Sequence, residues 1–136
     1  MRKKTILYSP ILLLIVFTIV VFSNPLRWPV ERIRANILKR TSIGMEMEDV
    51  INLIESNEMW KIDYISNEFG YNLRMGRPEE YSPNFTTSGN VIGKHSIRVH
   101  LGEYKAFFIT DVIAFFGFDE NSRLVNLHVR KDIDAL

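Results

Sequence analysis

The residues with the widest chemical repertoire in this 136-residue chain are its three histidines, because it contains no cysteine. The absence of cysteine excludes thiol catalysis, thiolate metal sites and disulfides. A zinc site would need His95, His100 and His128 together with carboxylates. On a strand, the odd separation of His95 and His100 places them on opposite faces. A predicted strand between His100 and His128 keeps them about 10 Å apart. We therefore predict structural or surface histidines, with no metal and no other cofactor.

A hydrolytic site can be assembled only loosely from the other polar residues. Ser96, His128 and Asp111 could form a Ser-His-Asp arrangement, but the Gly-x-Ser-x-Gly turn that presents such a serine is missing. A P-loop and a dinucleotide-binding glycine pattern are missing as well. Glu79 and Glu80 could be an acid–base pair, although adjacent loop carboxylates are usually just solvated. The sequence therefore predicts no catalytic residues.

The N-terminal two dozen residues are mostly apolar, and their pattern indicates that the protein works in or at a membrane. Three basic residues precede the run 6–22, which contains no charge. As a helix this run would be about 26 Å long, close to the ~30 Å hydrocarbon core of a bilayer. We predict that residues 1–23 form an uncleaved signal anchor, a single transmembrane helix that contacts membrane lipid through residues 5–23. The alternative is a signal peptide, with secretion after cleavage near Ser23.

Charge divides the remainder of the chain into two parts. Residues 24–40, a basic stem that includes a first helix, carry five basic residues and one acidic residue. Residues 41–136 carry nine basic and fifteen acidic residues, a net charge of −6. A basic segment beside a bilayer can attract anionic head groups, at about 1 kcal/mol per Lys or Arg, and the alternative is a solvated helix face. An acidic domain repels phosphate, so nucleic acid is not expected as a partner. We place the acidic part outside the cytoplasm.

Hydrophobic spacing predicts two helices followed by an antiparallel meander. Apolar residues recur at helical spacing over about 30–40 and 46–56. Alternating patterns then predict strands at about 60–64, 97–101, 107–118 and 124–130. Helices that precede the strands in this way are typical of an α+β domain. The predicted fold is an N-terminal transmembrane helix followed by two helices packed on a four-stranded antiparallel sheet.

The third predicted strand is apolar on both faces, whereas the helices can cover only one of them. The long loop predicted over residues 70–93 could cover the second face. The side chains available for this are Tyr71, Leu73, Met75, Tyr81 and Phe85. Otherwise an exposed aromatic patch would mark a protein partner. The candidate partner-binding residues are Phe108, Val112, Phe116, Tyr81 and Phe85.

Residues 43–50 read Ile-Gly-Met-Glu-Met-Glu-Asp-Val, a Gly-Met turn with an acidic helix start. Residues 118–125 read Phe-Asp-Glu-Asn-Ser-Arg-Leu-Val, an acidic turn between strands. These two segments resemble the small-protein-A (BamE-like) family of outer-membrane assembly lipoproteins. The resemblance implies a two-layer α+β fold. The lipid-bearing cysteine of that family is missing, and Glu46 stands where a Ser or Thr cap is expected.

These observations favour a membrane-anchored, non-enzymatic interaction domain that assists assembly or regulation of a cell-envelope complex. The alternative is an immunity or inhibitor protein that binds one toxin or enzyme, since a charge of −6 suits a basic target. A hydrolase without recognisable motifs is a third class, and its candidate residues are Glu79, Glu80 and His128.

Overall fold

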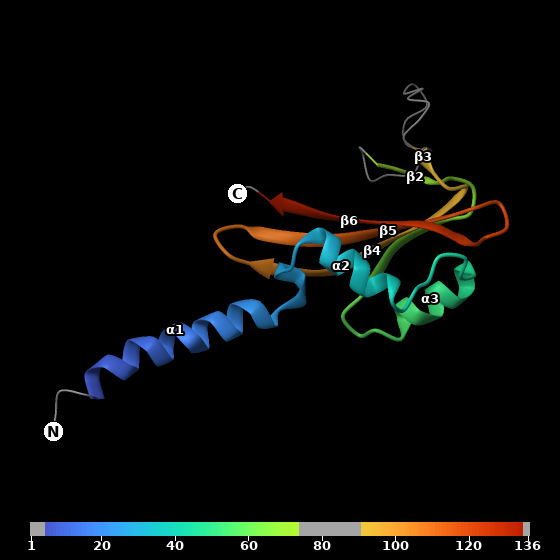
Figure 1. The fold of residues 1–136 in the computed structure, drawn as a ribbon. Helices are drawn as coiled ribbons and strands as arrows, with labels where there is room; N and C mark the ends of the chain where they lie inside the picture. The colour runs from blue at the N-terminus through green and yellow to red at the C-terminus, as the bar shows by residue number, and fades with distance from the viewer. Residues whose placement is uncertain (1–4, 74–90, 135–136) are drawn as a thin grey trace.

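The computed structural model describes residues 5–73 and 91–134. The helices are α1 (Thr5–Ser23), the 3-10 helix η1 (Pro25–Arg27), α2 (Val30–Leu38) and α3 (Met47–Glu55). The strands are β1 (Lys61–Ser66), β2 (Tyr71–Asn72), β3 (Val91–Ile92), β4 (His95–Lys105), β5 (Ile109–Phe118) and β6 (Leu124–Asp134). Figure 1 shows α1 projecting away from the domain, in which α2 and α3 lie on one side of the main sheet and the separate two-stranded sheet β2-β3 lies on the other.

The N-terminal segment is helical, but it is not the predicted membrane span. In the part of the chain that the structure describes, no helix is both long and apolar enough to cross a membrane. The transmembrane helix predicted over residues 1–23 is therefore wrong. The α-helix has 19 residues, with Pro10 inside it. Ser9, Pro10 and Thr18 interrupt the apolar run, whereas a span needs about 20 predominantly apolar residues.

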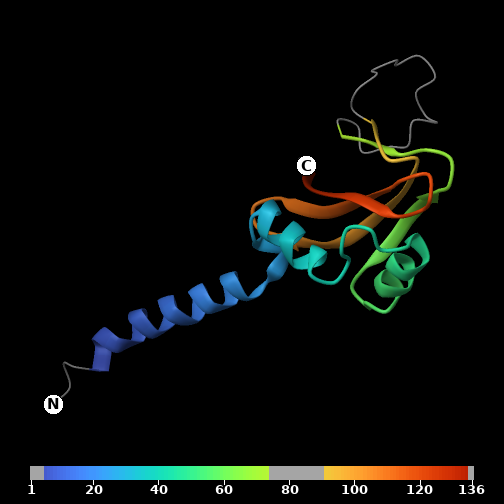
Figure 2. The same ribbon diagram turned by 45° about the vertical axis from the view of Figure 1, so that its right-hand side comes forward.

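The main sheet has the predicted four strands, in the order β1-β4-β5-β6, and every neighbouring pair is antiparallel. Helices α2 and α3 correspond to the two predicted helices and lie on one face of this sheet (Figure 2). Helix α2 packs along β6 and α3 packs beside β1. The Arg34 side chain fixes α2 to the sheet edge, because its Nε donates to the Leu127 carbonyl oxygen at 2.6 Å. The two-layer α+β arrangement is therefore confirmed.

The core lies between the helices and this face of the sheet. Each helix buries one apolar stripe, as its 3.6-residue period requires. The buried core residues are Ile33, Ile37, Met47, Val50, Ile54, Ile97, Val99, Leu101, Val112, Ala114, Phe116, Phe118, Leu124, Leu127 and Val129. Removing each large side chain from water contributes about 1.5–3 kcal/mol. The cysteine-free domain is thus stabilised by packing alone.

The two segments that resemble the small-protein-A family lie side by side in the structure. The Gly44 N–H donates to the Leu124 carbonyl oxygen, and the Met47 N–H donates to the Ser122 carbonyl oxygen, both at 2.8 Å. Glu46 precedes α3 without a capping side-chain hydrogen bond. Instead its carboxylate pairs with Arg123 at 3.0 Å. The β5–β6 turn therefore holds the start of α3.

Two β-bulges change which face a side chain occupies. In β1, Ile62 lies opposite Val99 and Tyr64 lies opposite Arg98, so Asp63 is an extra residue. Ile62 therefore packs on the helix-side core while Tyr64 lies on the other face. In β4 the register shifts between His100 and Gly102. The strand prediction placed Ile62 and Tyr64 on one face, because strict alternation has no extra residue.

Gly102, beside the bulge in β4, accommodates η1. Its φ is +135°, and a Cβ built there would lie 2.9 Å from the Leu26 Cδ1 atom of η1. We expect Gly102→Ala to lower the free energy of unfolding by about 1–3 kcal/mol, from backbone strain plus displacement of Leu26. Denaturant titration measures this. Gly44→Ala is the control, since Gly44 has φ +90° but no atom within 4 Å of a built Cβ. Equal losses in both variants would contradict the contact with η1.

Candidate functional site

The second face of the sheet, opposite the helices, is covered rather than exposed. Tyr71 and Phe115 are 0% and 1% exposed, and their rings lie 5.6 Å apart. Ile92 packs against the same cluster. The guanidinium groups of Arg98 and Arg130 lie over the Phe115 ring at 5.9 and 5.5 Å. Both faces of β5 are thus buried, which leaves no exposed aromatic patch there.

The loop predicted to cover this face does so at its ends. Tyr71 at its start packs on Phe115, whereas Leu73 is 37% exposed. Met75, Tyr81 and Phe85 lie outside the described residues. The loop prediction is confirmed for Tyr71 and not for Leu73. Among the described residues, Arg98 and Arg130 add to this cover, which the hydrophobic pattern alone could not indicate.

The polar residues considered for catalysis are held in separate places. The Ser96 hydroxyl donates to the Phe69 carbonyl oxygen at 2.9 Å. Asp111 pairs with His100, with 3.0 Å between Oδ1 and Nε2. His128 lies instead opposite Phe115. Ser96, Asp111 and His128 therefore form no triad, and Glu79 and Glu80 lie outside the described residues.

The histidines also form no metal site in residues 5–73 and 91–134, where no cluster of three or more potential ligands occurs. The ring of His95 contacts the Asn67 carbonyl oxygen. His100 is occupied by Asp111 and lies two strands from His128. Each histidine thus has a structural contact of its own.

His128 gives the domain a pH-dependent stability. Its pKa is lowered from 6.5 by burial, and then by the positive charges of Arg130 and Arg34. The unfolded chain therefore binds the proton more readily, so the free energy of unfolding falls as pH drops through about 6.5. We expect His128→Phe to reduce this slope in the range below about pH 6.5. Thermal unfolding of both proteins across that range measures it, and identical slopes would contradict the assignment.

Three of the five candidate partner-binding residues are divided between core and surface, while the other two, Tyr81 and Phe85, lie outside the described residues. Val112 and Phe116 are 0% exposed beneath the helices, so they are core residues and cannot contact a partner in this fold. Phe108 is 50% exposed, and its neighbour Phe107 is 96% exposed. Both precede β5 at the tip of the β4–β5 hairpin, where the Ala106 N–H donates to the Phe108 carbonyl oxygen at 3.1 Å.

Phe107 was not a candidate from the sequence, although a signal was present. The predicted strand began at Phe107 and assigned it to one face by alternation. The dipeptide follows Lys105 and Ala106, a charged residue and a small one, which interrupt the apolar pattern just before it. Two adjacent phenylalanines also cannot both face one core in a strand. Strand β5 begins only at Ile109, which leaves both rings in the turn.

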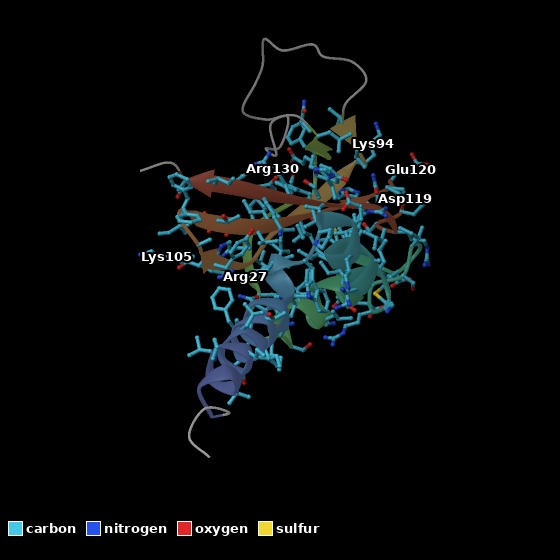
Figure 3. All side chains as sticks on the ribbon, turned by 60° about the vertical axis from the view of Figure 1, so that its left-hand side comes forward. Arg27, Lys94, Lys105, Asp119, Glu120 and Arg130 are labelled. Carbon is cyan, nitrogen blue, oxygen red and sulfur yellow. The ribbon has the colours of Figure 1, made fainter. Side chains whose placement is uncertain are left out.

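A basic and aromatic girdle, formed by Arg27, Trp28, Arg32, Tyr104 and Lys131, lies beside this hairpin. The Arg27 Nη2 atom donates to the Lys105 carbonyl oxygen at 2.9 Å, and its guanidinium lies 5.3 Å from the Tyr104 ring centroid. Arg32 lies 4.2 Å from the Trp28 ring centroid, and Lys131 donates to the Trp28 carbonyl oxygen at 2.8 Å. Figure 3 shows Arg27 and Lys105 together near the point where α1 leaves the domain. The girdle thus connects η1, α2 and the hairpin.

The opposite end of the domain carries an acidic hollow of about 680 Å³. Glu68, Asp119 and Glu120 line it together with Lys94. Figure 3 shows Lys94, Asp119 and Glu120 near one another and far from Arg27 and Lys105. The hollow is therefore lined by three carboxylates and one lysine, whereas the girdle at the α1 end is basic and aromatic.

The chain matches no protein-family model, and neither a curated protein nor a solved structure is significantly similar to it. The resemblance to the small-protein-A family stays a prediction. The functional argument therefore depends on this chain's own surfaces.

Proposed function

We propose that this chain is a non-enzymatic interaction domain that works at a lipid surface. Exposed apolar side chains of α1 and of the β4–β5 hairpin tip contact the lipid. This contact holds the α+β domain where it can bind a protein partner during assembly or regulation of a cell-envelope complex. The observation that carries the proposal is the 96% exposure of Phe107 at the tip of the β4–β5 hairpin. Figure 1 shows this hairpin tip at the end of the domain from which α1 leaves.

The first support is the amount of apolar side chain that this end exposes. In α1, every residue from Ile11 to Phe17 is apolar and 49 to 70% exposed. Seven consecutive residues go around the helix almost twice, so no side of it is covered by the domain. Phe107, Phe108 and Ile133 add exposures of 96, 50 and 64%. Soluble monomers rarely leave such contiguous apolar surface in water.

The second support is the kind of residue that flanks this apolar surface. Trp and Tyr are enriched at the boundary between hydrocarbon and head groups, and Trp28 and Tyr104 flank the tip within the girdle. The segment 24–40 carries five basic residues and one acidic residue. Basic side chains near a lipid surface attract anionic head groups. Glu103 and Asp134 are acidic residues of the neighbouring strands, so we expect this attraction to be moderate.

The protein partner is proposed from charge. Residues 41–136 have a net charge of −6, and the acidic hollow lies at the end away from the girdle. A partner with a basic surface fits that end. The inhibitor alternative would use the same charge, and it stays a prediction, as do the extracytoplasmic location of residues 41–136 and secretion after cleavage near Ser23.

Vesicle partitioning tests the proposal. The full-length protein is mixed with phosphatidylcholine vesicles, with and without phosphatidylglycerol, and the bound fraction is measured by flotation at several lipid concentrations. We expect binding to both, tighter with phosphatidylglycerol at low salt and less so at high salt. Protein that stays in the aqueous fraction with both vesicle types would overturn the proposal.

A further inference from the structure

A second hollow, of about 320 Å³, lies among η1, α2 and the segment that enters β1. We call it the η1 cleft. Ile37 and Leu101, both nearly fully buried, line it together with Leu26 and Trp60. Its volume is within the range of about 300–1,000 Å³ usual for small-molecule sites. Its lining can therefore surround the apolar part of a small ligand.

The polar side chains that line the η1 cleft offer mainly hydrogen-bond donors to a ligand. Asn24 Oδ1 accepts from the Leu26 N–H and Asn57 Oδ1 accepts from the Met59 N–H, both at 3.0 Å. These bonds engage the amide oxygens and leave the NH₂ groups as the remaining polar atoms of the two side chains. Arg40 and Asn36 complete the polar lining, and no acidic residue contributes to it.

Arg40 is the one charged residue that lines the η1 cleft in the part of the chain that the structure describes. Among the described residues, the four ion pairs involve other basic side chains, namely Arg98, His100, Arg123 and Arg130. An unpaired guanidinium beside amide donors matches a carboxylate or phosphate group. A quaternary ammonium head would offer these donors no acceptor, and a neutral polar head would leave the guanidinium charge without a counter-charge.

We propose that the η1 cleft binds an amphipathic anion, a hydrocarbon chain that ends in a carboxylate or phosphate. The hydrocarbon packs on Leu26, Trp60 and Leu101, and the anionic head contacts Arg40 and the asparagine amides. The same chemistry is available from a membrane lipid and from a free fatty acid. This inference goes beyond the proposed function, because the cleft could bind a free fatty acid in a protein that never touches a vesicle.

Trp60 provides a local reporter. The chain has two tryptophans, so Trp28→Phe in the full-length protein leaves Trp60 alone in the cleft lining. Sodium dodecanoate, below its micelle concentration, is titrated against the fluorescence of Trp60. Dodecyltrimethylammonium is the matched amphiphile of opposite charge. We expect a saturable blue shift of Trp60 emission with dodecanoate. The concentration that gives half of the maximal shift should be about tenfold higher for dodecyltrimethylammonium, because it lacks the charge-assisted contact with Arg40.

Two exposed neighbouring residues supply the variants. Arg40→Gln should weaken dodecanoate binding about tenfold, because it removes the guanidinium that contacts the head. Lys39→Gln removes one positive charge at the adjacent position, which does not line the cleft, and should leave binding unchanged. Equal responses to the two amphiphiles, or equal effects of the two variants, would overturn the proposal.

A final arm distinguishes the two sources of the ligand. Trp60 emission is recorded with phosphatidylglycerol vesicles instead of dodecanoate. A shift that Arg40→Gln removes supports a membrane lipid as the ligand, while a shift with dodecanoate alone supports a free fatty acid. Binding to vesicles without any change at Trp60 would leave the proposed function intact and separate it from the cleft.

Discussion

Replacing Phe107 and Phe108 together by aspartate is expected to lower the vesicle partition coefficient of the full-length chain by about tenfold or more. Burying one phenylalanine contributes about 1.5–3 kcal/mol, and a carboxylate at the same place resists dehydration. Because α1 and the tip would bind together, losing the tip lowers the overall constant even while α1 still binds. The measurement is flotation at limiting lipid concentration.

The matched control introduces the same charge at a distant exposed apolar residue. Ile65 is 44% exposed and Ile43 is 57% exposed, and neither is in the hairpin tip or lines the η1 cleft. Ile65→Asp with Ile43→Asp should change partitioning only slightly, since two distant carboxylates alter the net charge but remove no lipid contact. A similar loss in both double variants would show that the charge matters and the tip does not.

Replacing Phe116 by alanine is expected to lower the free energy of unfolding by about 3–5 kcal/mol. Its ring is 0% exposed in the core between the sheet and the helices, so alanine leaves a cavity that rigid neighbours fill only partly. A domain of this size has a total stability of about 5–15 kcal/mol. Denaturant titration should therefore show a variant that unfolds at a much lower denaturant concentration, or one that is already unfolded without denaturant.

Phe107→Ala is the control for this second prediction. The ring of Phe107 is 96% exposed, so its removal should change stability by about 0.5 kcal/mol or less. The pair of variants separates the buried ring of Phe116 from the exposed ring of Phe107. If Phe116→Ala were as stable as Phe107→Ala, the described core would be wrong.

The sequence predicted the two-layer domain because its local signals agree with its packing. Helices α2 and α3 carry apolar stripes at helical spacing, and β4, β5 and β6 alternate or are apolar throughout. Their order along the chain then leaves few ways to bury them. Turn chemistry at Asp119 was also readable, and its carboxylate accepts from the Asn121 and Arg123 N–H groups at 2.9 Å.

The sequence could not predict features that depend on contacts between distant segments. An extra residue at Asp63 shifts Tyr64 to the second face, and nothing in the local pattern marks that bulge. Phe115 was expected to need an apolar cover or a partner, whereas Arg98 and Arg130 cover it with their guanidinium faces. The sequence also could not show that Val112 and Phe116 lie in the core beneath the helices. The exposed aromatic residues are instead Phe107 and Phe108, in the turn before β5.

The N-terminal prediction was wrong for a different reason. The transmembrane assignment counted the absence of charge over residues 6–22, although Ser9, Pro10 and Thr18 lower the apolarity of that run. The stretch from Ile11 to Phe17 is apolar throughout, and its exposure is the part of the pattern that supports contact with lipid. A hydrophobic run without charges is thus compatible with contact with lipid, but it does not by itself predict a transmembrane helix.

The most direct test of the lipid-surface proposal is the depth of a spin label at the hairpin tip. The chain has no cysteine, so Ala106→Cys places one nitroxide beside Phe107 and leaves both rings in place. Asn121→Cys, in the β5–β6 turn, is the control. With the full-length protein on phosphatidylglycerol-containing vesicles, the label at 106 should be relaxed by lipid-dissolved oxygen, and the label at 121 by an aqueous nickel complex. Equal accessibility of both labels to the aqueous reagent would contradict the proposal.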